Sequence, residues 1–289
     1  MKTFYIRSFS KINLSLRVTK RLKSGYHNIE SLVTFANLFD IIGIKEINYK
    51  EDRIRFYGKF KKGINEKNNS IKKTIELFKK NNFLKGKNFS IKIKKNIPQG
   101  AGLGGGSMNS STLINFFLLK YKLKISEKKL LSIARKIGFD VPLGLKIKNT
   151  ILLGNSKNLV RTNKKLNLYL VLAYPMIKCE TEDIYSKNKR FSKPYLRRHI
   201  FNNNSKKLFN LNNLAADRND LQGIVFTLYP KIQFLNNFIE KQEKCIFSRM
   251  TGSGSTCVGF FNTLIGAQKA KNNIMKKFPN YWCEIAKTI

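Results

Sequence analysis

Acidic residues are scarce in this chain of 289 residues, where Lys and Arg number 56 and Asp and Glu only 17, so the formal net charge is +39. The 4 cysteines lie far apart and form no Cys-x-x-Cys pair, which predicts reduced thiols rather than a disulfide framework. No apolar run reaches membrane-spanning length, and no apolar segment near the start is typical of a secretion signal. We therefore expect a cytoplasmic protein that does not contact a membrane.

The excess of positive charge has two interpretations. It could be the electrostatic footprint of a nucleic-acid-binding protein, or compositional drift that enriches Lys, Asn and Ile throughout. The lysines are spread along the chain, and Asn is also frequent, as in residues 202–204. No segment combines basic residues with stacking aromatics. We therefore expect no specific nucleic acid partner, although the charge would still attract anionic substrates.

Residues 96–112 join a glycine-rich loop to the start of a predicted helix. Residues 89–93 alternate apolar and polar side chains, which indicates a half-buried strand. Residues 113–118 are mostly apolar and predict a helix, with Ser107 or Asn109 as its N-cap. A strand, a glycine loop and a helix N-terminus together bind phosphate, because glycines let backbone N–H groups approach an anion and the helix dipole favours negative charge.

The glycine loop is not a Walker A motif, because no Lys-Ser/Thr pair follows its last glycine, and it is a poor dinucleotide fingerprint. A flexible linker is an alternative, but linkers do not lie between a strand and an apolar helix. The pattern Pro-x-Gly-x-Gly-Leu-Gly-Gly-Gly-Ser of residues 98–107 resembles the phosphate loop of the GHMP small-molecule kinases.

Other segments extend this resemblance over most of the chain. They are Ser-Lys-Ile-Asn-Leu at residues 10–14, Gly-Tyr-His at 25–27, Gly-x-Asp-Val-Pro at 138–142 and a glycine turn at 252–254. The Gly-Tyr-His signature resembles the branch of the family that phosphorylates a cytidine diphosphate-linked methylerythritol. It separates that branch from the homoserine, mevalonate and galactose kinases.

The resemblance implies an α+β GHMP kinase fold with two domains. Residues 1–155 would form an ATP-binding domain like domain 2 of ribosomal protein S5, and residues 156–289 a ferredoxin-like substrate domain. It further implies transfer of the γ-phosphoryl group of ATP, with Mg²⁺, to the 2-hydroxyl of the acceptor, in the methylerythritol phosphate route to isoprenoid precursors. The partner would be this small molecule, and the chain would be a monomer or a homodimer.

The resemblance also implies the site residues. Asp140 would be the catalytic base, and Lys11 would lie beside it near the reacting hydroxyl. ATP would be bound by Asn69, Lys95, Pro98, Gln99, Gly100, Ala101, Gly102, Leu103, Gly104, Gly105, Gly106, Ser107 and Met108. The acceptor would be bound by Asn13, Tyr26, His27, Thr181 and Tyr185, with the two tyrosines stacking on cytosine and His27 reading its edge. No residue is assigned as a metal ligand, and Mg²⁺ would bridge phosphate oxygens.

Local sequence leaves alternatives open at two of these positions. Asp140 alone fits a turn residue that makes an Asx hydrogen bond, and His27 alone fits a surface turn. Met108 stands where the family usually has a second serine. Because a thioether cannot donate to phosphate and is a weak ligand for Mg²⁺, we predict that Ser107 and the loop backbone suffice.

Three other functions remain open: another GHMP kinase acting on a homoserine- or mevalonate-type alcohol, a basic nucleic-acid-binding protein on this scaffold, and a degenerate chain that keeps the fold without activity. Periodicity also predicts a strand over residues 4–18, interrupted at 8–11, helices over 127–137 and 264–278, and a strand over 168–173. Residues 219–221 and 229–230 match a further segment of the family, and the resemblance implies a helix between them. We expect the polar, basic residues 186–213 to form a loosely held surface segment.

Overall fold

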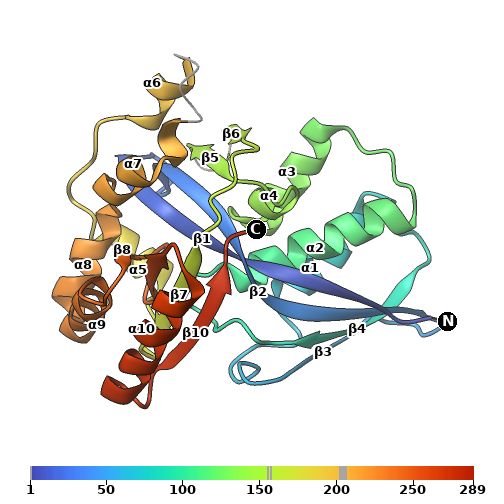
Figure 1. Ribbon diagram of the computed structural model, residues 1–289. Helices are drawn as coiled ribbons and strands as arrows, with labels where there is room; N and C mark the ends of the chain where they lie inside the picture. The colour runs from blue at the N-terminus through green and yellow to red at the C-terminus, as the bar shows by residue number, and fades with distance from the viewer. Residues whose placement is uncertain (1, 155, 157, 202–206) are drawn as a thin grey trace. The chain divides into compact units, whose positions relative to one another are not determined.

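A computed structural model describes residues 2–154, 156, 158–201 and 207–289 (Figure 1). The chain divides into two compact units, each made of separate stretches. Unit 1 comprises Met1–Ser10, Leu38–Pro98 and Gly104–Ile147, and unit 2 comprises Lys11–Asn37, Gln99–Leu103 and Lys148–Ile289. The chain therefore passes between the units within its two long N-terminal strands, at both ends of residues 99–103 in the glycine-rich loop, and between Ile147 and Lys148.

The two long strands, β1 (Phe4–Arg21) and β2 (His27–Ile47), pair with each other and serve both units. In unit 1, β2 is antiparallel to β4 (Asn88–Lys94), and β3 (Arg53–Tyr57) is parallel to β4. In unit 2, β2 is antiparallel to β5 (Thr150–Leu153), which pairs with β6 (Asn158–Arg161). The predicted strand over residues 4–18 is confirmed, but the expected interruption at residues 8–11 is wrong, because β1 continues through them.

Three helices cover one face of the unit 1 strands (Figure 1). They are α1 (Ser70–Lys80), α2 (Gly105–Lys120) and α3 (Glu127–Ile137), and the short helix α4 (Val141–Gly144) follows. The alternation of β4 buries Phe89, Ile91 and Ile93 against the helices. Successive side chains of a strand point to opposite faces, so every second side chain of β4 faces the core. This accounts for the alternation that predicted the strand.

Helix α2 begins earlier than predicted. Gly104 is its N-cap, with φ 69 and no side-chain capping hydrogen bond, so the prediction of Ser107 or Asn109 as the N-cap is wrong. Glycine adopts this left-handed conformation without a steric penalty. A helix start without a side-chain cap leaves its first N–H groups to other acceptors, which suits anion binding.

Unit 2 contains a second, antiparallel sheet with strand order β10-β7-β9-β8. The strands are β7 (Tyr169–Tyr174), β8 (Cys245–Met250), β9 (Cys257–Phe261) and β10 (Trp282–Lys287). With helices between β7 and β8 and between β9 and β10, the connectivity is the β-α-β-β-α-β pattern of ferredoxin-like folds.

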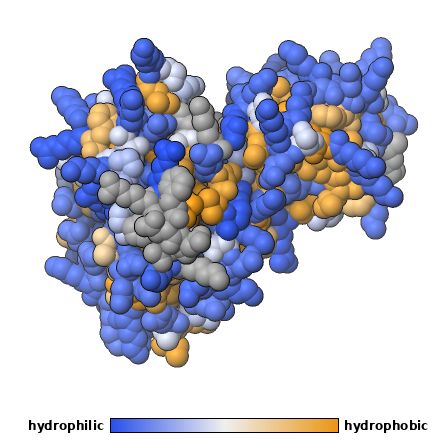
Figure 2. Space-filling model, turned by 90° about the horizontal axis from the view of Figure 1, so that it is seen from above, coloured by the Kyte–Doolittle hydropathy of each residue, from blue (hydrophilic) through white to orange (hydrophobic). Residues whose placement is uncertain are grey.

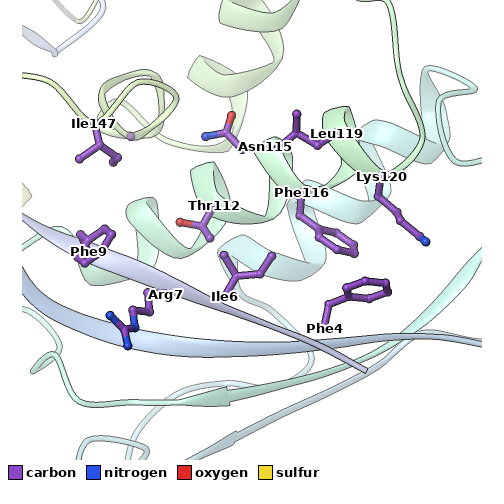
Figure 3. A pocket seen from close by; sticks show the side chains of 11 residues that line it. Phe4, Ile6, Arg7, Phe9, Thr112, Asn115, Phe116, Leu119, Lys120 and Ile147 are labelled. Carbon is purple, nitrogen blue, oxygen red and sulfur yellow. The ribbon is translucent and has the colours of Figure 1, made fainter. Parts of the chain in front are cut away.

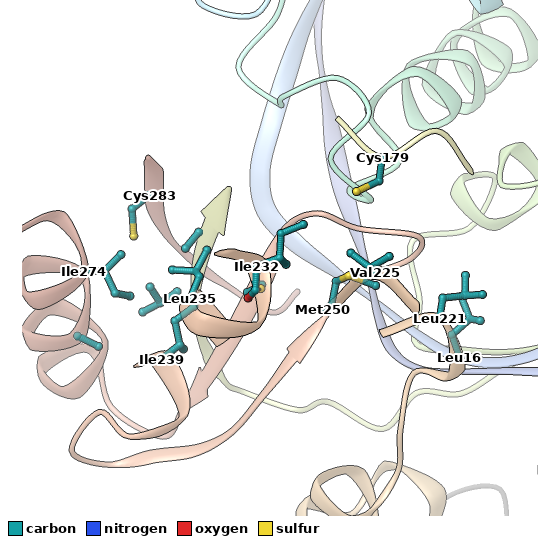
Figure 4. Close-up of a cluster of buried hydrophobic side chains, with 14 of the residues drawn as sticks. Leu16, Cys179, Leu221, Val225, Ile232, Leu235, Ile239, Met250, Ile274 and Cys283 are labelled. Carbon is teal, nitrogen blue, oxygen red and sulfur yellow. The ribbon is translucent and has the colours of Figure 1, made fainter. Parts of the chain in front are cut away.

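The helices of unit 2 pack an apolar core onto this sheet. They are α5 (Thr181–Ser186), α6 (Leu196–Phe201), the 3₁₀ turn η1 (Lys207–Phe209), α7 (Leu211–Ala216), α8 (Asp220–Leu228), α9 (Pro230–Glu240) and α10 (Leu264–Lys277). Figure 4 shows Leu235 and Ile239 of α9 near Ile274 of α10, all fully buried. The predicted helices α3, α8 and α10 and the strand β7 are confirmed.

The predicted loose segment over residues 186–213 is held more tightly than expected. Glu30 Oε2 accepts the backbone N–H of Leu196 at 2.7 Å, and Ser192 and Leu196 are buried. The expectation of a loose attachment is therefore wrong at Ser192 and Leu196, whereas most of the described side chains of this segment are exposed, as expected of a surface segment; residues 202–206 lie outside the described part.

The predicted domain boundary falls at Asn155, outside the described residues. The compact units interleave along the chain rather than dividing at one position, so the boundary of 155 stays a prediction about sequence domains. No described helix has the length and apolar character needed to cross a membrane. Figure 2 shows mainly hydrophilic side chains on the face seen from above, interrupted by hydrophobic patches.

Candidate active site

The turn that carries Asp140 is attached to α2 in unit 1. Val141 donates its N–H to Gly138 O at 3.1 Å and Leu143 donates to Asp140 O at 3.1 Å, while Ser111 Oγ donates to Val141 O at 2.7 Å. Asp140 is the N-cap of α4 but its side chain makes no capping hydrogen bond. The side chain therefore does not make the capping hydrogen bond of the turn alternative, and its role as a catalytic base stays a prediction.

The start of α2 lies beside this turn. A Cβ placed on Gly138 would lie 3.6 Å from Ser107 Oγ, so the Ser107 hydroxyl is close to the turn that holds Asp140. Ser70 Oγ, at the start of α1, donates to Gly106 O at 3.0 Å. Unit 1 thus brings together the phosphate-loop end of α2, the Asp140 turn and the start of α1.

The side chain of Met108 points away from the loop. It is 1% exposed, and its Sδ would lie 2.9 Å from a Cβ placed on Gly144 of α4. The thioether therefore fills the space between α2 and α4, where glycine allows the close approach. The backbone N–H of Met108 donates to Gly104 O at 2.9 Å, and a contact of Met108 with the nucleotide stays a prediction.

The other two predicted nucleotide residues of unit 1 are engaged in local contacts. Asn69 Oδ1 accepts the N–H groups of Ile71 and Lys72, each at 3.0 Å, and so caps α1. Lys95 is 3% exposed, and its ammonium donates to buried Asp40. Their contacts with a nucleotide stay predictions.

In unit 2, Lys11 and Asn13 belong to one buried network. Lys11 is 4% exposed, its N–H donates to Leu103 O at 3.1 Å, and its ammonium donates to Asn13 Oδ1. Asn13 in turn donates its N–H to Thr251 Oγ1 at 2.9 Å and its amide to Ser31 Oγ at 2.8 Å. The amide of Asn13 therefore orients the Lys11 ammonium.

The two glycine segments of unit 2 pack backbone against backbone. Gly102 has φ +76, and a Cβ there would lie 2.1 Å from Thr251 O. Thr256 also donates its N–H to Ala101 O at 3.3 Å. Only glycine fits at residue 102, so the turn after β8 and the phosphate loop form one structure within unit 2.

Thr181 and a lysine that no motif indicated border this structure. Thr181 Oγ1 lies 2.9 Å from Ser253 Oγ. The aliphatic stem of Lys178 lies against Gly100, where a Cβ would come within 2.7 Å of its Cγ. Sequence reasoning missed Lys178, because one lysine among so many carries no local signal.

A cluster of aromatic rings surrounds His27 in unit 2. The ring centroid of His27 lies 5.3 Å from that of Tyr185 and 6.3 Å from that of Phe191. His27 is only 8% exposed, which contradicts the surface-turn alternative, and burial and then the charge of Arg21 lower its pKa. Among the described residues its Nε2 has no hydrogen-bond partner. Tyr26 is 54% exposed, and Phe191 was not anticipated from the sequence.

A separate apolar cavity of about 430 Å³ lies between β1 and α2 in unit 1 (Figure 3). Figure 3 shows Phe4 and Ile6 of β1 beneath Phe116 of α2, and the rings of Phe4 and Phe116 lie 5.5 Å apart. None of the predicted site residues lines this cavity.

The predicted catalytic residues belong to different compact units, Asp140 to unit 1 and Lys11 to unit 2. Their approach to each other therefore stays a prediction. Within unit 1, a helix start without a side-chain cap lies close to the Asp140 turn, and within unit 2 the buried Lys11 donates its backbone N–H to Leu103 O of the glycine loop. The features within each unit, on an α+β fold, are those expected of a small-molecule phosphotransferase.

Comparison with known proteins identifies the family. The model of the GHMP kinase N-terminal domain matches residues 69–145, and that of the GHMP kinase C-terminal domain matches residues 194–280. The chain belongs to the GHMP kinases, which are ATP-dependent, and the predicted two-domain α+β fold is confirmed.

Two full-length relatives carry the name of one particular kinase within this family. The chain is 40% identical over 289 residues to the 4-diphosphocytidyl-2-C-methyl-D-erythritol kinase of Pelagibacter ubique, covering 100% of both chains. It is 36% identical to the protein of that name from Wolbachia sp. subsp. Brugia malayi, covering 98% of this chain and 97% of the relative.

Solved structures share the fold. A 4-(cytidine 5'-diphospho)-2C-methyl-D-erythritol kinase has a TM-score of 0.74 at 21% identity, covering 98% of this chain and 99% of its own. A homoserine kinase from Cytophaga hutchinsonii has a TM-score of 0.70 at 14% identity, covering 100% of this chain and 95% of its own.

Proposed function

We propose that this chain transfers the γ-phosphoryl group of ATP to the 2-hydroxyl of 4-diphosphocytidyl-2-C-methyl-D-erythritol, forming the 2-phosphate and ADP. The observation that carries the proposal is the Gly-Tyr-His segment, whose buried His27 lies beside Tyr185 and has an Nε2 without a hydrogen-bond partner in the described part of the chain. Full-length relatives that bear the name of this kinase support the same acceptor.

In this proposal the glycine loop, residues 98–108, holds the ATP phosphates. Phosphoryl transfer requires alignment and charge neutralisation more than covalent chemistry by the protein. The uncapped start of α2 offers N–H groups and the positive end of a helix dipole to the phosphates. Asn69, at the start of α1, and Lys95, directly after β4, also contact the nucleotide.

The residues present fit Mg²⁺ that is held mainly by the nucleotide. Among the described residues no group of three or more His, Cys, Asp or Glu could form a protein cage for a metal ion. Mg²⁺ in kinases is held by phosphate oxygens with few protein ligands. The Ser107 hydroxyl is the oxygen donor at the α2 start, and the ion would neutralise charge on the phosphate oxygens.

Asp140 acts as the general base that accepts the proton of the 2-hydroxyl. Its carboxylate belongs to a turn that Ser111 fixes to α2 through the hydrogen bond to Val141 O. Lys11, oriented by Asn13, supplies positive charge beside the same hydroxyl and its developing negative charge. This assignment requires the Lys11 and Asp140 side chains to meet at the acceptor.

The cytidine half of the acceptor binds in unit 2. Tyr26 and Tyr185 stack on the cytosine, and His27 hydrogen-bonds to its edge. The lowered pKa keeps the His27 imidazole neutral at neutral pH, so one ring nitrogen donates and the other accepts. A buried histidine without a partner favours a base that satisfies it over one that leaves it unpaired. Thr181 and Asn13 complete the acceptor contacts.

The same proposal places the chain in the methylerythritol phosphate route to isoprenoid precursors, as a cytoplasmic monomer or homodimer without a specific nucleic acid partner. The +39 net charge then reflects composition and attracts anionic substrates.

The proposal is tested by coupling ADP release to an absorbance assay with the cytidylated acceptor. Asp140→Asn is expected to lower kcat by more than about a hundredfold, the range for loss of a general base. Glu127→Gln, which changes an exposed carboxylate on α3 with 74% side-chain exposure, is the matched control and keeps wild-type activity.

The assay also separates the alternatives. CDP competes with the acceptor if the cytidine site exists, whereas a homoserine- or mevalonate-type kinase would turn over its own alcohol and ignore CDP. If Lys11 and Asp140 act on the same hydroxyl, the double variant Lys11→Ala/Asp140→Asn loses little more than Asp140→Asn alone. Independent, additive losses would contradict that shared role.

A further inference from the structure

One buried carboxylate in unit 1 contacts both flanks of the glycine loop. Asp40, on β2, is 0% exposed. Its Oδ1 accepts the backbone N–H groups of Asn96 at 2.8 Å and Ile97 at 2.9 Å, in the segment that leads into the loop. Its Oδ2 accepts the ammonium of Lys95 and, at 3.0 Å, the amide of Asn109 on α2. The segments before and after the glycine loop therefore both donate hydrogen bonds to the same carboxylate.

The Lys95 ammonium that Asp40 holds lies at the start of α2. A Cβ placed on Gly105, the first residue of that helix, would lie 3.2 Å from Lys95 Nζ. A positive charge at a helix N-terminus is unfavourable by itself, because it faces the positive end of the helix dipole. The carboxylate of Asp40 neutralises it and so lets Lys95 and the helix start lie together.

The contacts of Asp40 are more specific in location than burial of an ion pair requires. A buried carboxylate needs hydrogen bonds from any available donors, but all four donors to Asp40 come from the two segments that flank the loop. Loss of Asp40 would release the end of β4 from the start of α2, and the spacing between them determines where the loop N–H groups point.

We propose that Asp40 is a positioning residue for the ATP phosphates, acting through Lys95, the backbone of residues 96–97 and Asn109 to hold the glycine loop in its phosphate-binding shape. The inference rests on the proposed function only in that the loop binds ATP. Asp40 itself is 0% exposed, so its effect on the phosphates is transmitted by these groups.

The opposite end of β4 provides a matched control. Asp52 accepts the N–H of Phe89 at 2.8 Å and the ammonium of Lys79 at 2.7 Å, so it also joins a backbone N–H and a lysine. It lies at the start of β4 rather than at the loop, and its side chain is 20% exposed. A purely structural role predicts that both aspartates affect stability and neither affects the nucleotide.

The experiment measures the Kd of a non-hydrolysable ATP analogue with Mg²⁺, and the Kd of CDP, by calorimetry well below the Tm of each variant. Asp40→Asn is expected to raise the Kd of the ATP analogue by about tenfold or more, because a misplaced loop loses preorganised contacts. Its KM for ATP rises more than its kcat falls, and its Kd for CDP is unchanged. Asp52→Asn lowers Tm and leaves both Kd values at wild type.

A second variant covers the case in which the lone Lys95 ammonium prevents folding. Asp40→Asn/Lys95→Met removes both buried charges, and replacement of a buried pair is tolerated better than loss of one partner. It is expected to recover Tm while keeping the raised Kd for the ATP analogue. Asn109→Ser, which keeps both charges, gives a smaller rise and decides the question if neither other variant folds.

The outcomes distinguish the two proposals. Wild-type protein that binds CDP but no ATP analogue overturns the proposed function itself. Wild-type protein that binds the analogue, with folded Asp40 variants of unchanged Kd, overturns only the positioning role. An equal rise in Asp52→Asn also overturns it, because any loss of stability would then weaken nucleotide binding.

Discussion

Met108 shows how one residue can depart from a motif without losing its place in the structure. The family usually has serine here, but the Met108 thioether is buried against Gly144 and faces α4 rather than the phosphate loop. The hydroxyl of the neighbouring Ser107 lies beside the Asp140 turn, where we expect it to serve as the polar group at this end of the loop.

Met108→Ser is therefore expected to gain no activity and to lose stability. Truncation of a buried methionine typically costs about 2–5 kcal/mol, and a buried hydroxyl adds a desolvation cost. Thermal unfolding and steady-state kinetics of the variant check this. A rise in kcat/KM of more than about tenfold, about 1.4 kcal/mol, would show that the missing serine matters for phosphate or Mg²⁺.

His27 predicts a pH dependence of stability. Its pKa is lowered from 6.5 by burial and by Arg21, so above 6.5 it is neutral in both the folded and the unfolded chain. As the pH falls below 6.5, the unfolded chain binds the proton more readily than the folded chain, and folding stability decreases.

Lowering the pH from about 7.5 to about 5.5 should therefore lower the Tm of wild type more than the Tm of His27→Gln. This interval brackets the usual histidine pKa. Differential scanning calorimetry of the two proteins in matched buffers measures this shift. Parallel Tm curves for the two proteins across this interval would contradict a neutral, buried His27.

At the scale of elements, the close contact between the phosphate loop and the turn after β8 requires glycine at residue 102. Both a positive φ of +76 and the carbonyl of Thr251 exclude a Cβ there. Gly63 offers a matched comparison, because its φ is +84 but no atom lies within 4 Å of a Cβ at that position.

Gly63→Ala should cost only the backbone strain of a left-handed residue, about 1–2 kcal/mol. Gly102→Ala should cost more, since the loop and the turn must separate, and should also lower kcat/KM for ATP. Urea unfolding and kinetics of the pair provide the test. Equal losses of stability with unchanged kinetics in both variants would show that the backbone contact is not needed for ATP binding.

At the scale of the whole molecule, the +39 net charge is spread along the sequence. Ion pairs neutralise few of the cations, because the sequence has only 17 acidic residues for 56 basic ones. The resulting positive field acts on any anionic ligand within roughly a Debye length, about 8–10 Å at physiological salt.

We expect kcat/KM for the anionic acceptor to fall about threefold or more between low and physiological ionic strength, with kcat nearly constant, because the field accelerates encounter rather than chemistry. Single-stranded DNA at micromolar concentration should not inhibit at physiological salt. Tight, steeply salt-dependent polynucleotide binding would instead support the nucleic-acid alternative.

Local sequence was sufficient to predict the strands and helices around the site. The alternation of residues 89–93, the glycine loop and the apolar run after it predicted β4, the phosphate loop and α2, because backbone periodicity and glycine conformation are local properties. The spaced motifs around Lys11, His27 and Asp140 indicated the family for the same reason: each is a short pattern whose residue types are set by one chemical task.

Only the tertiary structure revealed what holds these pieces in place. Asp40 meets Lys95 across 55 positions in sequence and Thr251 lies against Gly102 across 149, and neither pairing has a local signature. Sequence patterns also did not predict the burial of Met108, the ring of Phe191 beside His27 or the Gly104 N-cap. Such contacts depend on which surfaces pack together. The partner of a buried charge, or the backbone that lies against a glycine, can come from any distant part of the sequence that the fold brings there.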